Sequence, residues 1–335
     1  MGAIIYFFTT MNFLEVKGLT KQLQQNEVVS NISFELIQFK KLAIAGETGS
    51  GKSTLLKMIA GLVQPTSGKV FFEGEKVVGP EDKLLPGHKG IAYLSQYFEL
   101  RNNYRVEELL EYASQWPDAD ARDIFDICQI SHLLKRRTDQ LSGGEKQRIA
   151  AARLLVSSPK LLILDEPYSN LDMAHKNTLK QVIDQVAGRL NITCLLTSHD
   201  PTDVLSWADT ILVLQNGIIA DTGTPQQLYL MPATEYIAGL FGKYNHLPPA
   251  LLHQLDSLNT LLLNDLPLII RPEGMMITTD PAHGVRGKVT EVQYMGSHLL
   301  VQVMAHGQHF WVMTNQLHWQ LHQDAYLLLK AGVAN

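Results

Sequence analysis

One glycine-rich segment constrains the fold of this chain more than any other feature. Residues Gly46–Ser53 read Gly-Glu-Thr-Gly-Ser-Gly-Lys-Ser and fit the pattern Gly-x-x-x-x-Gly-Lys-[Ser/Thr]. The apolar run Lys41–Ala45 precedes the segment, and the helical pattern Ser53–Leu62 follows it. This order predicts a phosphate-binding loop, because glycines let backbone N–H groups turn inward and a helix N-terminus attracts anions. Lys52 would then reach the β and γ oxygens of a nucleotide, and Ser53 would ligate Mg²⁺.

Two acids end a second apolar run, Leu161–Leu164. Ligands of an open α/β sheet bind at the carboxyl ends of its strands, which is where Asp165 and Glu166 would lie. We expect Asp165 to hold Mg²⁺ through water and Glu166 to polarise an attacking water. Taken alone, the pair would be better explained as the solvated end of an ordinary strand. Downstream of a phosphate loop, the functional interpretation is favoured.

A second glycine turn, Leu141-Ser142-Gly143-Gly144-Glu145, precedes the helical pattern Glu145–Ser157. A helix that begins at such a turn offers a second surface for phosphate.

Short apolar runs alternate with helical patterns up to about Gly223, which predicts a parallel sheet with helices on both faces. Tyr104–Arg137 is helical in pattern and interrupts this alternation as an insertion. Three short segments predict a small antiparallel sheet at one edge: Leu14–Val16, Ile32–Leu36 and Val70–Phe72. Beyond Leu266 the pattern predicts a strand-rich barrel, with strands at Val285–Tyr294, Leu299–Met304 and His309–Met313. The predicted fold is therefore α/β, followed by a small all-β domain.

Composition narrows the class of protein. The length of 335 residues suits two domains, and 45% hydrophobic with 18% charged residues suits a well-filled globular core. A net charge of −5 does not favour a nucleic-acid backbone as partner. Cys128 and Cys194 lie in apolar contexts and are expected to be buried free thiols. Met1–Met11 is too short to span a bilayer, and we interpret Met11 as the functional start.

Together these motifs resemble the nucleotide-binding subunit of ATP-binding-cassette (ABC) transporters over about Asn12 to Gly242. Leu141–Glu145 is similar to the family signature Leu-Ser-Gly-Gly-Gln, with Glu145 in place of the usual glutamine. The family then implies that Ser142 and Gly144 bind the γ-phosphate held by a second copy of the chain. It also implies roles for three further segments: Gln96 would link Mg²⁺ and water to the membrane partner, Ser169–Asp172 would cross the dimer, and His199 would contact the γ-phosphate.

Each weaker motif has an ordinary alternative. A lone Gln96 is usually polar surface, and a lone His199 is usually a capping or core histidine. Their order along the chain favours the family interpretation. The predicted ATP-binding residues are Gly46, Glu47, Thr48, Gly49, Ser50, Gly51, Lys52, Ser53, Thr54, Ser142, Gly143, Gly144 and Asp172. The predicted catalytic residues are Glu166, His199 and Gln96, and the predicted Mg²⁺ ligands are Ser53, Gln96 and Asp165.

The C-terminal region resembles the accessory TOBE barrel, of the oligonucleotide-binding (OB) type, found in polyamine, iron, sulfate, molybdate and sugar importers. The resemblance is carried by Arg271-Pro272-Glu273 and Gly287–Gly296. The chain shows no basic, aromatic-rich strand face, so nucleic-acid binding is rejected. The predicted domains are an ABC ATPase domain at 12–242 with a helical subdomain at about 97–157, a linker at 243–270 and the barrel at 271–335. His318 and His322 could share a helix face and bind a metal, although solvated or core histidines are the favoured interpretation.

The resemblance implies an ATPase that powers solute import, with ATP and Mg²⁺ as cofactors and iron or polyamine as candidate cargo. Its partners would be a second copy of itself, permease subunits and, indirectly, a solute-binding protein, at the cytoplasmic face of the membrane. The alternatives are the ATPase of an exporter, a soluble ABC ATPase, and a regulatory ATP-binding protein. Leu23 occupies the place where the family usually stacks an aromatic side chain on adenine.

Overall fold

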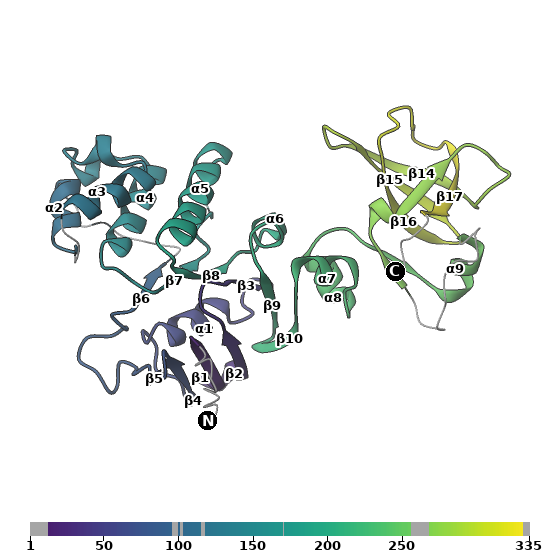
Figure 1. The fold of residues 1–335 in the computed structure, drawn as a ribbon. Helices are drawn as coiled ribbons and strands as arrows, with labels where there is room; N and C mark the ends of the chain where they lie inside the picture. The colour runs from purple at the N-terminus through teal and green to yellow at the C-terminus, as the bar shows by residue number, and fades with distance from the viewer. Residues whose placement is uncertain are drawn as a thin grey trace, which may run out of the picture. The chain divides into compact units, whose positions relative to one another are not determined.

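The computed structural model describes residues 13–95, 100, 103–114, 118–169, 171–255 and 268–330. The expectations for Met11, Gln96 and Asn170 lie outside these residues. The chain divides into two compact units, Met1–Pro225 and Gln226–Asn335, which are described separately below as the N-terminal unit and the C-terminal unit (Figure 1). Within the described residues, no helix is long and apolar enough to cross a membrane.

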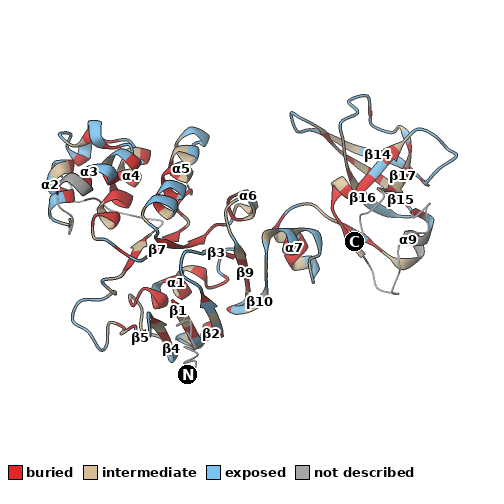
Figure 2. Cartoon of the chain, in the orientation of Figure 1, coloured by how far each residue is buried: buried red, intermediate tan, exposed pale blue. Residues whose placement is uncertain are grey.

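A six-stranded sheet with the order β10-β9-β3-β8-β7-β6 forms the centre of the N-terminal unit. Its parallel strands are β3 (Lys41–Ala45), β6 (Ile91–Leu94), β7 (Leu161–Asp165), β8 (Thr193–Thr197) and β9 (Thr210–Gln215), and β10 (Ile218–Gly223) pairs antiparallel with β9. Every residue of β7 and β8 is buried, as expected for strands that are covered on both faces (Figure 2). The predicted α/β architecture is confirmed.

A four-stranded antiparallel sheet with the order β2-β1-β4-β5 lies in the same unit, as predicted. It consists of β1 (Leu14–Leu23), β2 (Asn26–Leu36), β4 (Ser67–Phe72) and β5 (Glu75–Lys76). Leu14, Val16 and Leu19 point into the core that this sheet shares with the helix α1 (Lys52–Ile59). This core fixes the loop between β3 and α1.

The N-terminal unit also contains helices. The predicted insertion Tyr104–Arg137 contains α2 (Val106–Glu111), α3 (Asp118–Ile127) and the short 3-10 helix η1 (Ser131–Leu133). It is followed by the 3-10 helix η2 (Thr138–Gln140) and by α4 (Gly143–Leu155), and α5 (Met173–Arg189) and α6 (Pro201–Leu205) come later in the chain. Cys128 and Cys194 are buried and free, and burial raises the pKa of each thiol to about 12.

The C-terminal unit is built on a five-stranded antiparallel sheet with the order β13-β17-β14-β15-β16. The strands are β13 (Met275–Thr278), β14 (Val285–Tyr294), β15 (Leu299–Ala305), β16 (Gln308–Thr314) and β17 (Asp324–Leu329). Inward residues alternate along β15, as in the half-barrel that the sequence predicts. The helices α7 (Pro225–Leu230) and α8 (Glu235–Leu240) and the 3-10 helix η3 (Pro272–Gly274) precede this sheet.

Two details differ from the sequence-based expectation. Residues 243–270 were expected to form a linker, but they contain β11 (Asn245–Leu247) paired with β12 (Leu268–Ile270), and α9 (Pro249–Leu255). Leu247, Leu251 and Leu255 belong to the core of the C-terminal unit, so hydrophobic burial holds β11 and α9 in place. The domain boundaries themselves stay a prediction.

The predicted helix face of His318 and His322 is wrong. Both residues are exposed and lie in turns, because the chain reverses around the buried Trp319. The ring of His318 stacks on that of Trp319, with centroids 5.1 Å apart. Across the described residues, no cluster of three or more histidine, cysteine or acidic side chains could hold a metal ion.

Candidate nucleotide-binding site

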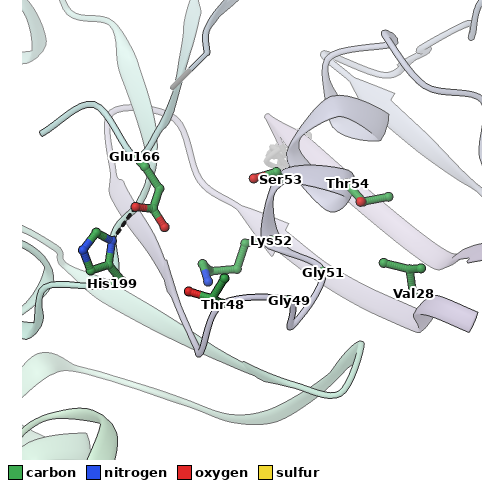
Figure 3. A pocket seen from close by; sticks show the side chains of 9 residues that line it. All are labelled: Val28, Thr48, Gly49, Gly51, Lys52, Ser53, Thr54, Glu166 and His199. Atoms are coloured by element: carbon green, nitrogen blue, oxygen red, sulfur yellow. Dashed lines mark hydrogen bonds and ion pairs between the residues drawn. The ribbon is translucent and has the colours of Figure 1, made fainter. Parts of the chain in front are cut away.

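A cavity of about 330 Å³ opens beside the loop between β3 and α1. Figure 3 shows Lys52 in the middle of this cavity, Glu166 and His199 at one end, and Val28 at the other. The lining residues are Val28, Thr48, Gly49, Gly51, Lys52, Ser53, Thr54, Glu166 and His199. Apart from Val28, all of these residues were predicted from the sequence to serve ATP binding or catalysis.

Lys52 is held by the backbone of its own loop. Its Nζ donates hydrogen bonds to the carbonyl oxygens of Gly46 and Glu47, both at 2.8 Å. The residue is only 6% exposed, and burial lowers the pKa of the ammonium, while Glu166 and Asp165 act in the opposite direction. Lys52 is thus a fixed cation at the start of α1, where the first helical N–H groups have no partner within the helix.

The loop can take this path only with glycine at one critical position. Gly51 precedes α1 with φ +100°, and a Cβ there would meet the carbonyl oxygen of Val28 at 2.5 Å. A side chain would therefore collide with the β2 backbone and would also strain a left-handed conformation. The close approach brings β2 against the loop. Ser50, the residue before Gly51, has a buried hydroxyl, and its backbone carbonyl accepts a hydrogen bond from the Gly217 N–H.

Asp165 is positioned by three hydroxyl groups. Ser53 Oγ and Thr197 Oγ1 donate to its Oδ1 at 3.0 and 2.9 Å, and the Tyr93 hydroxyl donates to its Oδ2 at 2.7 Å. Asp165 is 3% exposed, so these bonds compensate for a buried carboxylate. Burial, and then the hydrogen bond to Asp165, raise the pKa of Tyr93, which keeps the phenol protonated as a donor.

Glu166 follows β7 in a left-handed conformation, with φ +49°. Its backbone N–H donates to Thr197 in the neighbouring strand, and its Oε2 accepts hydrogen bonds from Ser169 Oγ at 2.8 Å and from His199 Nδ1. The Glu166 side chain is 13% exposed, whereas that of His199 is 60% exposed. The carboxylate thus stands at the cavity wall, linked to the histidine that follows β8 (Figure 3).

A charge network supports the segment that carries His199. Lys176 Nζ of α5 contacts Asp200 at 2.5 Å and Asp203 at 2.8 Å, and Lys180 contacts Asp203 at 2.7 Å. Asp203 is 1% exposed and also accepts a hydrogen bond from Ser198 Oγ. Burial raises the pKa of the Asp200 carboxyl, but hydrogen bonds from Lys176 and Thr202 outweigh it and hold the pKa at about 2.

The second glycine turn forms the start of α4. Ser142 is the N-cap residue: its Oγ accepts from the Glu145 N–H at 3.3 Å, while the Ser142 N–H donates to Glu145 Oε2 at 2.8 Å. This reciprocal capping box lowers the pKa of Glu145, chiefly through the backbone hydrogen bond from Ser142. Gly143 is exposed and Gly144 is buried.

The structure brings one group of predicted site residues together at the cavity and leaves another group outside the cavity. In the lining of the cavity, as far as the chain is described, Ser142, Gly143 and Gly144 do not appear. Asp172 caps α5 through a hydrogen bond from the His175 N–H. A single copy of the chain therefore carries two separate predicted phosphate-facing surfaces.

Sequence reasoning missed Tyr93 and Val28. Tyr93 is half-buried among buried residues in a short strand, and this pattern does not distinguish a hydrogen-bond donor from a core side chain. The expected base contact, Leu23, is 50% exposed and is not among the lining residues, whereas Val28 lies at the cavity wall. For Val28, the one signal available in the sequence was an apolar residue in the hairpin that precedes the glycine loop.

Comparisons with known proteins agree with this geometry. The profile of the ABC transporter family matches residues 29–169, and that of the TOBE domain matches residues 268–325. The chain is 30% identical over 340 residues to the Fe(3+) ions import ATP-binding protein FbpC 1 of Pectobacterium atrosepticum, covering 96% of this chain and 95% of the relative. It is 29% identical over 324 residues to the spermidine/putrescine import ATP-binding protein PotA of Clostridium acetobutylicum, covering 91% and 90% of the two chains.

Solved structures share the fold of the N-terminal unit. An ATP-binding cassette of an ABC transporter in its ADP conformation superposes with a TM-score of 0.58 at 23% identity, covering 69% of this chain and 99% of that one. A dimeric cassette in a post-hydrolysis state, bound to ADP and Pi, gives a TM-score of 0.55 at 22% identity, covering 63% and 98%.

A phosphate loop between β3 and α1, with carboxylates at the end of the parallel strand β7, defines a nucleotide-binding protein of the phosphate-loop class. Within this class, the chain belongs to the ATP-binding proteins of ABC transporters, and it is an ATPase with an added TOBE domain.

Proposed function

We propose that this chain is the subunit that binds and hydrolyses ATP in an importer of iron or polyamines. One observation carries the proposal: Lys52, Glu166 and His199 line a single cavity in a chain that also has a TOBE domain. The relatives named above are import ATP-binding proteins for Fe(3+) ions and for spermidine and putrescine. An exporter ATPase or a soluble ABC ATPase is less well supported, because the TOBE domain resembles the accessory domain of importers.

The cavity suggests how the nucleotide lies. Lys52, in the middle of the cavity, and the α1 N-terminus would take the triphosphate, while the end at Val28 would face the base. A lysine and a phosphate oxygen about 4 Å apart attract each other by roughly 4 kcal/mol at an effective dielectric of about 20. The phosphates therefore supply most of the affinity, and the base contributes apolar contact with Val28.

Ser53 and Asp165 suit Mg²⁺. Ser53 lines the cavity, its Oγ lies 3.0 Å from Asp165 Oδ1, and hydroxyl and carboxylate oxygens are ligands that this ion accepts. Mg²⁺ would neutralise charge on the β and γ phosphates. Thr197 and Tyr93 would hold the Asp165 carboxylate in place for this task.

Glu166 would orient the attacking water and accept its proton. Its carboxylate is fixed by Ser169 and His199, so it needs little rearrangement during the reaction. His199 is exposed enough to leave this contact and approach a γ-phosphate. Gln96, the third predicted catalytic residue, lies outside the described residues.

The complete site needs a second copy of the chain. Ser142 and Gly143 are exposed at the start of α4, Gly144 is buried beside them, and none of the three lines the cavity that contains Lys52, so within one copy they do not face the same phosphate. Two copies in opposite orientation would bring the turn of each to the cavity of the other. ATP would then hold the dimer closed, permease subunits would follow this closure, and hydrolysis would reset them. A solute-binding protein would deliver cargo on the other side of the membrane, and this subunit would act at the cytoplasmic face.

The substitution Glu166→Gln tests the proposal. The substitution keeps the shape of the side chain and removes the carboxylate that acts as the base, so the rate of ATP hydrolysis should fall by about 10²–10⁴-fold while ATP binding persists. ATP should then trap a dimer, measured by analytical ultracentrifugation with and without Mg²⁺. Glu81→Gln, at an exposed loop position, is the matched control and should behave like the parent. Hydrolysis at the parent rate in Glu166→Gln would remove Glu166 from the mechanism.

The cargo needs a separate experiment. Cells that lack this chain should lose uptake of radiolabelled Fe³⁺ or of radiolabelled spermidine, and the parent chain, but not Lys52→Met, should restore it. Unchanged uptake of both solutes would contradict the proposed cargo without affecting the assignment as an ATPase.

A further inference from the structure

A histidine packs against the second glycine turn. His175 lies in the first turn of α5, and its ring covers the face of Gly144 where a side chain would start. A Cβ at Gly144 would meet Cδ2 of this ring at 2.3 Å, which is far inside van der Waals contact. The absence of a side chain at Gly144 is therefore what admits the ring.

The other edge of the same ring is bound to Asp172. His175 Nδ1 lies 2.7 Å from Asp172 Oδ2, and the His175 backbone N–H donates to Asp172 Oδ1 at 2.9 Å. An ionised carboxylate only accepts hydrogen bonds, so Nδ1 carries the proton in this contact. The backbone hydrogen bond, followed by the ring hydrogen bond, lowers the pKa of Asp172, which keeps the acceptor ionised. The ring is thus fixed on both sides.

Asp172 ends the segment that starts at the proposed base. Glu166 follows β7, Ser169 donates to its carboxylate, and α5 begins directly after Asp172. His175 consequently joins two surfaces that come from distant parts of the sequence: the turn at 142–144 and the residue Asp172 at the start of α5. The capping of α5 does not need the ring, because the backbone N–H of His175 already fills that role.

We propose that His175 is a positioning residue of the ATP reaction, which locks the 142–144 turn to Asp172 at the start of α5 so that both surfaces meet the partner copy as one unit. The inference rests on the ATP-closed dimer of the proposed function. Without the ring, the turn and Asp172 would each have to be ordered when the dimer forms, and that loss of freedom would oppose closure. Binding of ATP to one copy, which involves Lys52 and the α1 N-terminus, would be unaffected.

The test uses the full chain with Glu166→Gln, which is expected to form an ATP-trapped dimer. His175→Ala removes both contacts, and His175→Leu keeps an apolar side chain against Gly144 while losing the bond to Asp172. One hydrogen bond accounts for about a threefold effect at each site, and a symmetric dimer has two sites, so the dimer dissociation constant should rise about tenfold in His175→Leu. His175→Ala also loses the packing against Gly144 and should weaken the dimer further. Binding of ATP by one copy, measured by fluorescence titration, should not change.

The chain contains a matched control. His283 has the same spacing to Asp280 that His175 has to Asp172, with its Nδ1 3.3 Å from the carboxylate, and it lies in the C-terminal unit. His283→Ala should therefore leave dimerisation unchanged. A loss of ATP binding together with dimerisation in His175→Ala would indicate a general structural role and would overturn the inference.

The possible failures can be told apart. If Glu166→Gln alone does not dimerise with ATP, the proposed function fails. If Glu166→Gln dimerises and adding His175→Ala does not weaken the dimer, only the positioning role fails. Parent-like dimerisation of His175→Leu would show that packing alone suffices and would contradict a lock through Asp172.

Discussion

The hydroxyl of Tyr93 provides the sharpest quantitative test of the site. It donates to Asp165 Oδ2 at 2.7 Å, while Ser53 and Thr197 donate to the other oxygen. Tyr93→Phe removes one oxygen atom and keeps the ring in place. The variant therefore isolates a single hydrogen bond to a carboxylate that is 3% exposed.

The expected loss of stability follows from the charge of the acceptor. A hydrogen bond to a charged group contributes about 1.5–3 kcal/mol, and the loss leaves one side of a buried carboxylate without this donor. Two hydroxyl groups still bind Oδ1, so we expect about 2 kcal/mol. For a unit of this size, about 1 kcal/mol corresponds to roughly 2–4 °C in Tm, so the N-terminal unit should melt about 4–8 °C lower.

Thermal and urea unfolding of the full chain, followed on the transition of the N-terminal unit, measure this change. Tyr112→Phe is the control, because Tyr112 is 85% exposed. The Mg²⁺ concentration for half-maximal ATPase activity should also rise, since the carboxylate that would hold the ion is less well oriented. A Tyr93→Phe variant within about 0.5 kcal/mol of the control would refute the view that this hydroxyl holds Asp165.

Three further predictions address other parts of the chain. The pKa of Asp200 is depressed from 3.8 to about 2, so its stabilising contribution is complete above about pH 4 and disappears as the pH falls through 2. Lys176→Met should remove this contribution and move the acid-unfolding midpoint, followed by circular dichroism, to higher pH. Val28→Ala should weaken ATP binding about fivefold in a fluorescence titration with little change in kcat, since roughly 1 kcal/mol of apolar contact is lost. Arg271 is 4% exposed and donates to the carbonyls of Tyr229 and Ala238, so Arg271→Met removes hydrogen bonds from a charged donor and should destabilise the C-terminal unit by about 3 kcal/mol in urea unfolding, while ATP binding stays intact.

The sequence was sufficient to predict the elements that surround the cavity. Local order carries this information, because the strand β3, the glycine loop and α1 follow each other directly in the chain. The apolar run before Asp165 likewise predicts a strand that is buried on both faces. The position of each carboxylate at a strand end then follows from the topology of parallel sheets.

Contacts between distant segments could not be predicted in the same way. Tyr93 reaches Asp165 because β6 pairs with β7 in a register that no local pattern encodes. The expected base contact, Leu23, lies outside the cavity lining for a related reason: β1 contains register shifts between Leu19 and Gln22, and Leu23 is exposed at the strand end. A slip of one residue exchanges the two faces of a strand, so counting residues from a family pattern fails there.

Glu145 illustrates how the structure accommodates a departure from the family signature. A carboxylate in place of glutamine brings a negative charge close to a turn that is proposed to face phosphate. The structure turns this carboxylate back to the Ser142 N–H at 2.8 Å, and Arg136 lies 3.7 Å away. A negative charge at a helix N-terminus is favourable by about 0.3–1 kcal/mol, so the charge stabilises the turn that it could otherwise disturb. With the Ser142 N–H occupied in this way, the proposed contact with phosphate would fall to the hydroxyl of Ser142 and the N–H groups of Gly143 and Gly144. The orientation of this turn would then decide whether these groups reach a phosphate, and the ring of His175 packs against the turn at Gly144.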